Sequence, residues 1–124
     1  MNCPKCKAEM ERVVFRGIEI DRCKDCKGIW FDALEEKMLA AMAGSELIDD
    51  GDPEVGDKLD RVDHIDCPMC QTEMIRMVDP RQTHIWYESC KVCYGVFFDA
   101  GEFSDLKEQT FIDRVRSVFT RERE

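Results

Sequence analysis

The stretch Cys23–Glu35, with the sequence C-K-D-C-K-G-I-W-F-D-A-L-E, decides the fold. It joins a C-x2-C pair to a glycine, two aromatic residues and an acidic residue of the kind that begins helices. The same pattern returns at Cys90–Glu102 as C-K-V-C-Y-G-V-F-F-D-A-G-E. A second C-x2-C pair precedes each copy, at residues 3–6 and 67–70, so the repeat accounts for all 8 cysteines. The chain is therefore read as two copies of one small unit.

The cysteine spacing predicts one four-thiolate metal site in each copy. One C-x2-C turn offers two thiolates to the same ion, and a hairpin between the pairs brings the second two alongside. A unit of about 40 residues also needs such a staple, because its hydrophobic core alone rarely suffices. The predicted ligands are Cys3, Cys6, Cys23 and Cys26 in the first copy, and Cys67, Cys70, Cys90 and Cys93 in the second.

We expect two zinc ions, one per site. Disulfides, a rubredoxin-type iron site and an iron–sulfur cluster are the alternatives, and iron is the main rival because four thiolates suit both metals. Four cysteines leave no open coordination position, which is typical of structural sites rather than catalytic ones. A thiol redox or metal-handling role is also open, although each C-x2-C pair has a second pair with which to share a metal.

Local patterns predict a hairpin followed by a helix in each copy. Alternating apolar and polar residues indicate strands at residues 10–16 and 18–22, and again at 74–78 and 83–89. Asp32 with Glu35, and Asp99 with Glu102, stand at the N-cap and N3 positions of an acidic capping box. The first helix is expected over about 33–43, and the second is expected to be long, with a possible break near Thr110.

These elements predict a small, metal-stabilised α+β fold made of two tandem zinc ribbons, each a β-hairpin with a trailing α-helix. The expected divisions are residues 1–44 for the first ribbon, 45–66 for a linker, and 67–124 for the second ribbon with its amphipathic C-terminal helix. The linker carries nine acidic and two basic residues. A helix beginning at Asp52-Pro53-Glu54 and a mobile tether are both open for it.

Both copies resemble the bacterial transcription-factor-type (TFIIB-type) zinc-ribbon family. The shared pattern is C-P-x-C, a hairpin, and then C-x-x-C-x-G-x-W-[aromatic or Leu]-D-x-G-E, over residues 3–36 and 67–103. Leu34 and Glu36 depart from the family's usual Gly and Leu, and Phe97 replaces its Trp. The resemblance implies a zinc-binding ribbon, and the family's name implies a link to nucleic acid or transcription by analogy of fold.

Charge argues against a polyanion as the main partner. The net charge is −9, and two four-thiolate zinc sites would make it more negative. Nucleic-acid contact would depend on a lysine cluster around the first site, which more simply stays solvated and offsets the thiolate charge. The cluster comprises Lys5, Lys7, Lys24 and Lys27.

Two apolar features could serve either folding or binding. At least one residue of each aromatic pair, Trp30/Phe31 and Phe97/Phe98, is expected to plug the space between hairpin and helix rather than to dock a partner. An apolar stripe on the C-terminal helix could pack within the chain or form a dimer or partner face. The stripe comprises Phe111, Ile112, Val115, Val118 and Phe119.

The sequence therefore predicts a non-enzymatic, zinc-binding adaptor that acts through contact with a protein partner or with its own copy. A nucleic-acid-binding or transcription accessory is the alternative. The chain begins Met1-Asn2-Cys3 and has no apolar run of membrane-spanning length, so no targeting segment or membrane partner is expected. Because reduced paired cysteines are typical of the cytosol, we expect a cytoplasmic protein.

Overall fold

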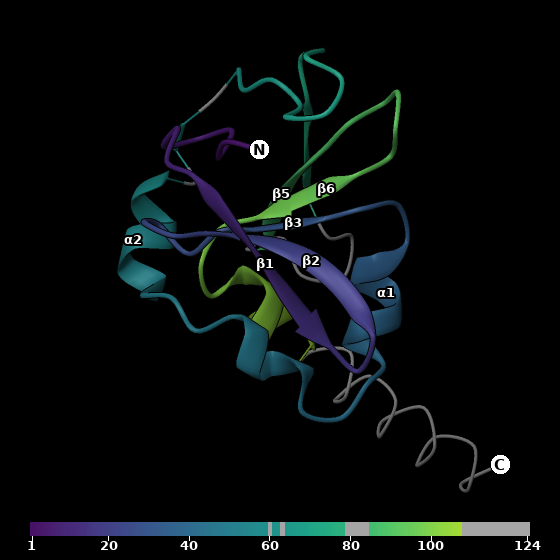
Figure 1. Ribbon diagram of the computed structural model, residues 1–124. Coiled ribbons are helices and arrows are strands. Elements are labelled where there is room, and N and C mark those ends of the chain that lie inside the picture. The colour runs from purple at the N-terminus through teal and green to yellow at the C-terminus, as the bar shows by residue number, and fades with distance from the viewer. Residues whose placement is uncertain (60, 63, 79–84, 108–124) are drawn as a thin grey trace, which may run out of the picture.

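The computed structural model describes residues 1–59, 61–62, 64–78 and 85–107 (Figure 1). Six strands form one antiparallel sheet in the order β1-β2-β3-β6-β5-β4. The first copy contributes β1 (Met10–Phe15), β2 (Ile18–Cys23) and β3 (Ile29–Phe31). The second copy contributes β4 (Ile75–Val78), β5 (Trp86–Ser89) and β6 (Val96–Phe98). The predicted hairpins are confirmed as β1–β2 and β4–β5.

A third strand in each copy, which the sequence reading did not expect, joins the two copies. β3 pairs with β2, β6 pairs with β5, and β3 and β6 pair with each other at the centre of the sheet (Figure 1). The central register places Trp30 opposite Phe97, while Ile29 faces Phe98 and Phe31 faces Val96. Because these are equivalent positions of the repeat, the copies are related by an approximate two-fold axis through the Trp30–Phe97 pair.

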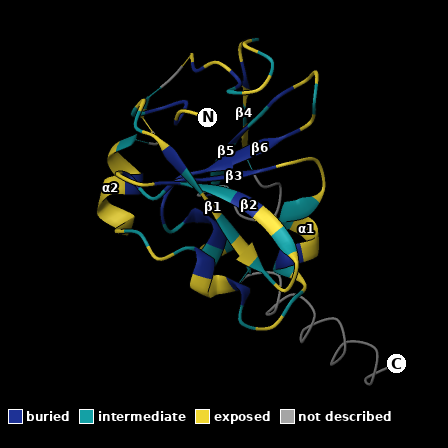
Figure 2. Ribbon diagram, viewed as in Figure 1, coloured by how far each residue is buried: buried dark blue, intermediate teal, exposed yellow. Residues whose placement is uncertain are grey.

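Figure 2 shows the central strands β3 and β6 in the colour of buried residues. The two faces of the sheet carry separate apolar clusters. One face holds Trp30, Phe97 and the cysteines of both copies. The other holds Phe31, Phe98 and Phe103, whose rings pack against one another at centroid distances of 5.1 to 6.2 Å. All four aromatic residues of the predicted plugs are buried. The prediction is confirmed for one ring of each pair, because Phe31 and Phe98 pack with the helix residues Leu39 and Phe103, whereas Trp30 and Phe97 pack with the cysteines.

Two glycines permit the close approach of the copies. A Cβ at Gly28 would lie 2.3 Å from the Phe97 ring, and one at Gly95 would lie 2.2 Å from the Trp30 ring. Each aromatic ring therefore packs directly on the backbone that follows the other copy's metal loop. Any side chain there would push the central strands apart.

The first helix is shorter than the sequence predicts. α1 spans Glu35–Ala40, because Leu34 has a left-handed φ of 70° and delays the start. One half of the expected capping pair is present: the Asp32 N–H donates to Glu35 Oε1 at 2.9 Å. The Asp32 carboxylate instead accepts a hydrogen bond from Trp30 Nε1 at 3.3 Å. In the second copy, residues 102–107 are helical.

The linker contains helical segments and contacts both copies. It forms the 3₁₀ helix η1 (Ser45–Ile48) and helix α2 (Pro53–Leu59). Helix α2 begins where the sequence predicts, and Asp52 Oδ1 accepts a hydrogen bond from the Glu54 N–H at 2.9 Å. Asp49 accepts hydrogen bonds from the N–H groups of Gly101 and Ser104 at 2.8 and 2.9 Å. This linker carboxylate therefore caps the helical segment 102–107.

Some sequence predictions fall on residues that the structure does not describe. They are the second hairpin turn, the break near Thr110 and the whole C-terminal stripe of Phe111, Ile112, Val115, Val118 and Phe119. Within the described ranges, no helix combines the length and apolar character needed to cross a membrane.

Candidate metal centres

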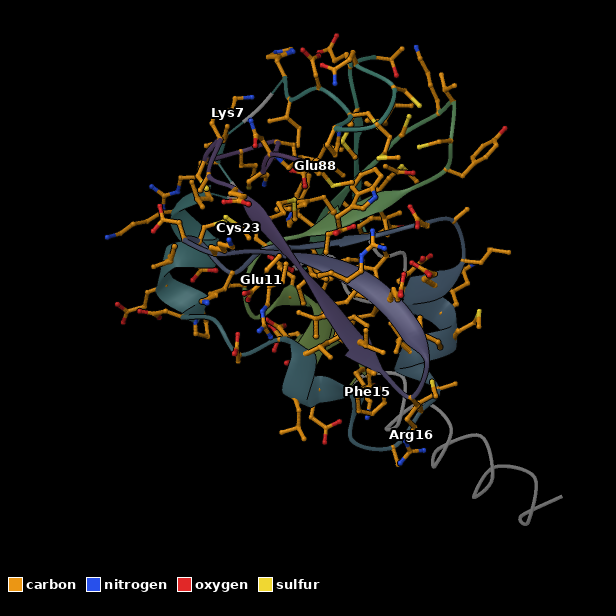
Figure 3. All side chains as sticks on the ribbon, in the orientation of Figure 1. Lys7, Glu11, Phe15, Arg16, Cys23 and Glu88 are labelled. Carbon is orange, nitrogen blue, oxygen red and sulfur yellow. The ribbon has the colours of Figure 1, made fainter. Side chains whose placement is uncertain are left out.

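The first metal centre is built from two loops at the end of the β1–β2 hairpin that is remote from its turn. Figure 3 shows Cys23 and Arg16 near opposite ends of this hairpin. The four Sγ atoms of Cys3, Cys6, Cys23 and Cys26 lie within 4.8 Å of one another. Individual Sγ–Sγ distances are 3.7 Å for Cys3–Cys26 and 3.3 Å for Cys6–Cys23.

The second centre repeats this arrangement with Cys67, Cys70, Cys90 and Cys93. Its Cys67 and Cys93 Sγ atoms are 3.8 Å apart. The Thr72 hydroxyl lies 3.6 Å from Cys90 Sγ and is an additional polar contact to this site. The sequence-predicted ligands are thus brought together in the two predicted sets of four.

Backbone N–H groups point at the sulfurs in both centres. The N–H groups of Asp25 and Cys26 donate to Cys23 Sγ at 3.4 Å, and the Gly28 N–H lies 3.5 Å from Cys26 Sγ. The N–H groups of Val92 and Cys93 approach Cys90 Sγ in the same way, at 3.4 and 3.5 Å. These donors stabilise thiolate charge, which is the form of cysteine that binds metal.

The donor geometry fits zinc. A tetrahedral ion with Zn–S bonds of about 2.3 Å requires sulfurs about 3.8 Å apart. The Cys3–Cys26 and Cys67–Cys93 separations match this spacing, and the Cys6–Cys23 pair, at 3.3 Å, lies closer. All eight thiols are free, so the disulfide alternative is not what the structure contains. The hydrogen bond from the Cys26 thiol lowers the pKa of Cys3 to about 5, which makes one thiolate available at neutral pH. The two centres therefore fit two zinc ions, each with four protein ligands.

The lysine cluster around the first site is dispersed by the fold. Lys7 and Lys24 are exposed, and Lys24 pairs with Glu9 at 3.2 Å. Lys27 is half-buried, with its Cβ beside Gly51. Lys5 differs from the expectation of a solvated lysine, because its side chain is 0% exposed.

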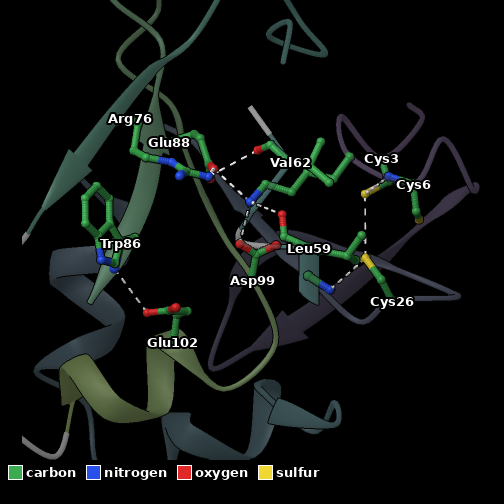
Figure 4. A network of polar contacts seen from close by, with 12 residues as sticks. Cys3, Cys6, Cys26, Leu59, Val62, Arg76, Trp86, Glu88, Asp99 and Glu102 are labelled. Carbon is green, nitrogen blue, oxygen red and sulfur yellow. Dashed lines mark hydrogen bonds and ion pairs between the residues drawn. The ribbon is translucent and has the colours of Figure 1, made fainter. Parts of the chain in front are cut away.

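Lys5 crosses to the second copy and binds two carboxylates there. Its Nζ lies 2.5 Å from Asp99 Oδ2 and 2.7 Å from Glu88 Oε1, and it donates to the Leu59 carbonyl at 3.1 Å (Figure 4). Burial would lower the pKa of Lys5, but Asp99 and Glu88 raise it above its ordinary value. The ammonium is therefore charged at neutral pH and joins the first metal loop, the second copy and the linker.

Sequence reasoning missed this ion-pair site because its members come from three separate segments. Asp99 was assigned only to helix capping, and Glu88 carried no local signal. The contrast between Lys5 and its repeat counterpart Met69 was a usable signal, since one copy places a cation where the other places a thioether. Around Glu88, Arg76 Nη2 lies 3.8 Å from the carboxylate and also donates to the Val62 carbonyl at 3.2 Å (Figure 4).

The fold and the two closed four-cysteine centres define the chain as a tandem zinc-ribbon protein. The TFIIB-type zinc-ribbon family, described as "Transcription factor zinc-finger", matches residues 2–41 and 66–109, and the chain belongs to this family. The two matched segments correspond to the two copies. Comparisons with curated proteins and with solved structures gave no match.

Proposed function

We propose that the chain is a non-enzymatic double zinc-ribbon adaptor that binds a protein partner through the loops of its second metal centre. The observation that carries this proposal is a set of apolar side chains exposed on both of these loops. Met69 is 58% exposed, Val92 57% and Tyr94 68%. The two loops hold the same four-cysteine cluster, so these side chains project from one end of the molecule. We call Met69, Val92 and Tyr94 the apolar tip.

Comparison with the first copy supports a specific role for this tip. The corresponding positions there are Lys5, Asp25 and Lys27. The metal loops therefore fold equally well with charged residues, and metal binding does not require apolar ones. Exposed apolar clusters are a feature of protein contact surfaces, particularly where they include tyrosine and methionine. A partner with an apolar recess matches this surface best.

The closed metal centres support a non-enzymatic role. Four cysteine ligands leave no coordination position for water or substrate, so each zinc would stabilise its loops rather than activate a reactant. Metal binding then supplies folding energy and holds the loops of the apolar tip in place. An adaptor of this kind, with reduced thiols, suits the cytoplasm.

Nucleic-acid binding is the second candidate, favoured by the description of the family as transcription-factor zinc-fingers. Of the predicted lysines, Lys7, Lys24 and Lys27 reach the surface at least in part, whereas Lys5 is engaged with Asp99 and Glu88. A net charge of −9 opposes association with a polyanion. We therefore favour the protein-binding function.

The test compares three zinc-loaded baits in a cell extract. They are the wild-type chain, the double variant Met69→Asp/Tyr94→Asp, and Leu47→Asp. Leu47 is 75% exposed on η1 and controls for loss of an exposed apolar side chain elsewhere. We expect a protein that is retained by wild type and by Leu47→Asp but lost with the double variant. Zinc content of two per chain in each bait confirms that the centres are intact.

Sedimentation of the same three proteins tests self-association. A dimer that only the double variant loses would identify a second copy of the chain as the partner. Retention of the same proteins by all three baits would overturn the proposal. So would salt-sensitive binding of DNA or RNA, measured at low ionic strength, that is abolished by Lys7→Gln/Lys24→Gln and unaffected by changes to the apolar tip.

A further inference from the structure

The approximate two-fold axis relates the Lys5 binding site of the second copy to an open acidic pocket in the first. Glu88 and Asp99 of the second copy correspond to Asp21 and Asp32 of the first. The strand registers agree: Asp21 faces Trp30 as Glu88 faces Phe97. The flanking arginines correspond as well, because Arg12 faces Asp21 as Arg76 faces Glu88.

In the second copy this pair of acids holds an ammonium group. Both carboxylates lie within 2.7 Å of Lys5 Nζ, and the Leu59 carbonyl completes three oxygen contacts (Figure 4). The chain thus displays, within its own fold, the ligand that this arrangement of two acids accepts.

In the first copy no lysine forms an ion pair with these acids, as far as the described residues show. The position equivalent to Lys5 is Met69, which is exposed and has no charge. Asp21 and Asp32 instead line an open pocket of about 360 Å³. Asp32 is exposed to solvent, whereas its counterpart Asp99 is 1% exposed.

The pocket has an excess of negative charge. Its wall contains four carboxylates, from Glu19, Asp21, Asp32 and Glu35, against the single guanidinium of Arg12. Arg12 is engaged mainly with Glu19 at 2.8 Å and lies 3.8 Å from Asp21. The chain's N-terminal ammonium acts on Asp21 only at longer range. Asp32 therefore has no cation of its own among the pocket residues.

A residue that differs between the two copies makes the pocket more negative. Glu19 occupies the position of Trp86 in the second copy, where the Arg76 guanidinium lies 5.4 Å from the ring centroid. At this position the first copy therefore has a carboxylate where the second copy has an aromatic ring. Ile18 and Met38 supply apolar surface beside the acids, which suits the methylene stem of a lysine.

We propose that this pocket binds the side-chain ammonium of a lysine presented by a partner protein, as Glu88 and Asp99 bind Lys5. The shared chemistry is that of a primary alkylammonium, and an unbranched stem lying along Met38 favours lysine over a compact cation. The proposal does not depend on the function assigned to the apolar tip, which lies on the loops of the other copy.

Nuclear magnetic resonance of the zinc-loaded full chain can test whether this pocket binds a lysine side chain. The probes are N-acetyl-lysine amide, its Nε-acetylated form, 1,4-diaminobutane and magnesium chloride. The reporters are the Trp30 indole N–H, which donates to Asp32 Oδ1, and the backbone N–H of Asp32, which donates to Glu35 Oε1. We expect N-acetyl-lysine amide to shift both signals saturably, and the Nε-acetylated form to leave them in place.

Charge-neutral variants locate the site. Asp32→Asn and Asp21→Asn should each weaken lysine binding about fivefold, the upper range for one solvent-accessible ion pair. Glu9→Gln is the matched control, because Glu9 is an exposed acid outside the pocket, and it should bind as wild type does. Met69→Asp/Tyr94→Asp should also bind normally, which separates this site from the apolar tip.

Several results would overturn the proposal. Equal shifts from the Nε-acetylated probe would show that the ammonium is not recognised, and equal shifts from magnesium would show a general cation site. Binding of diaminobutane without binding of the lysine amide would exclude a protein lysine as the ligand. Unchanged affinity in Asp32→Asn, with amide dispersion and zinc content intact, would remove the pocket from the interaction.

Discussion

Replacing Lys5 by methionine tests whether the buried ammonium holds the two copies together. Methionine is the residue that the chain itself places at the equivalent position 69, so it is compatible with a metal loop. The change removes the cation that contacts Glu88 and Asp99 and leaves both carboxylates under the loop. Their side chains are 4% and 0% exposed. Removal of one partner from a buried ion pair costs about 3–5 kcal/mol.

That loss would be a large part of the stability of an ordinary small domain, which is roughly 5–15 kcal/mol. Urea unfolding of the zinc-loaded protein, followed by tryptophan fluorescence at fixed zinc concentration, measures it. Lys7→Met is the matched control. Because Lys7 is exposed on the same loop and its Nζ donates to the neighbouring Pro4 carbonyl, this variant's free energy of unfolding should change by less than about 0.5 kcal/mol.

Neutralising Glu88 and Asp99 in the Lys5→Met variant provides a second test of the same reasoning. Adding Glu88→Gln and Asp99→Asn to Lys5→Met removes the two buried negative charges that Lys5 contacted, so at least half of the lost free energy of unfolding should return. A loss below about 1 kcal/mol for Lys5→Met would refute the reasoning. A combined variant no more stable than Lys5→Met would also refute it, because packing rather than charge would then explain the loss.

Two further predictions concern the central strands and the metal. Gly95→Ala should lower the free energy of unfolding by about 1–3 kcal/mol and shift the Trp30 indole N–H signal, since the new Cβ would lie 2.2 Å from the ring. Gly17→Ala, which meets no atom within 4 Å, should leave that signal unchanged. Elemental analysis should give two zinc per chain, and their removal by a chelator should collapse the amide dispersion. Red protein containing iron would contradict the zinc assignment.

The metal ligands could be predicted because their geometry is local. C-x2-C fixes two sulfurs within one turn, and the hairpin between pairs leaves little freedom in how they meet. The start of α2 could be predicted for the same reason, since Asp52 caps through a contact two residues away. Such features depend on short stretches of chain, where sequence spacing and spatial distance are closely coupled.

The junction of the copies could not be predicted in the same way. I-W-F and V-F-F show no alternation, because both faces of β3 and β6 are buried, and a short apolar run does not specify a strand. The buried Lys5 site and the Asp49 cap join residues 94 and 52 positions apart, respectively. Contacts of this kind form only when the two copies pair through β3 and β6, so local sequence patterns do not predict them.

The β3–β6 pairing has the geometry of a homodimer interface within a single polypeptide. Its two edges are equivalent strands in antiparallel register, and each aromatic ring packs on the glycine of the other copy. Two separate chains would form such a pair only at sufficient concentration. Connection through a linker makes the encounter intramolecular, with an effective concentration set by linker length. The stability of the pair is thereby independent of how much protein is present, and both central edges are protected from pairing with other chains.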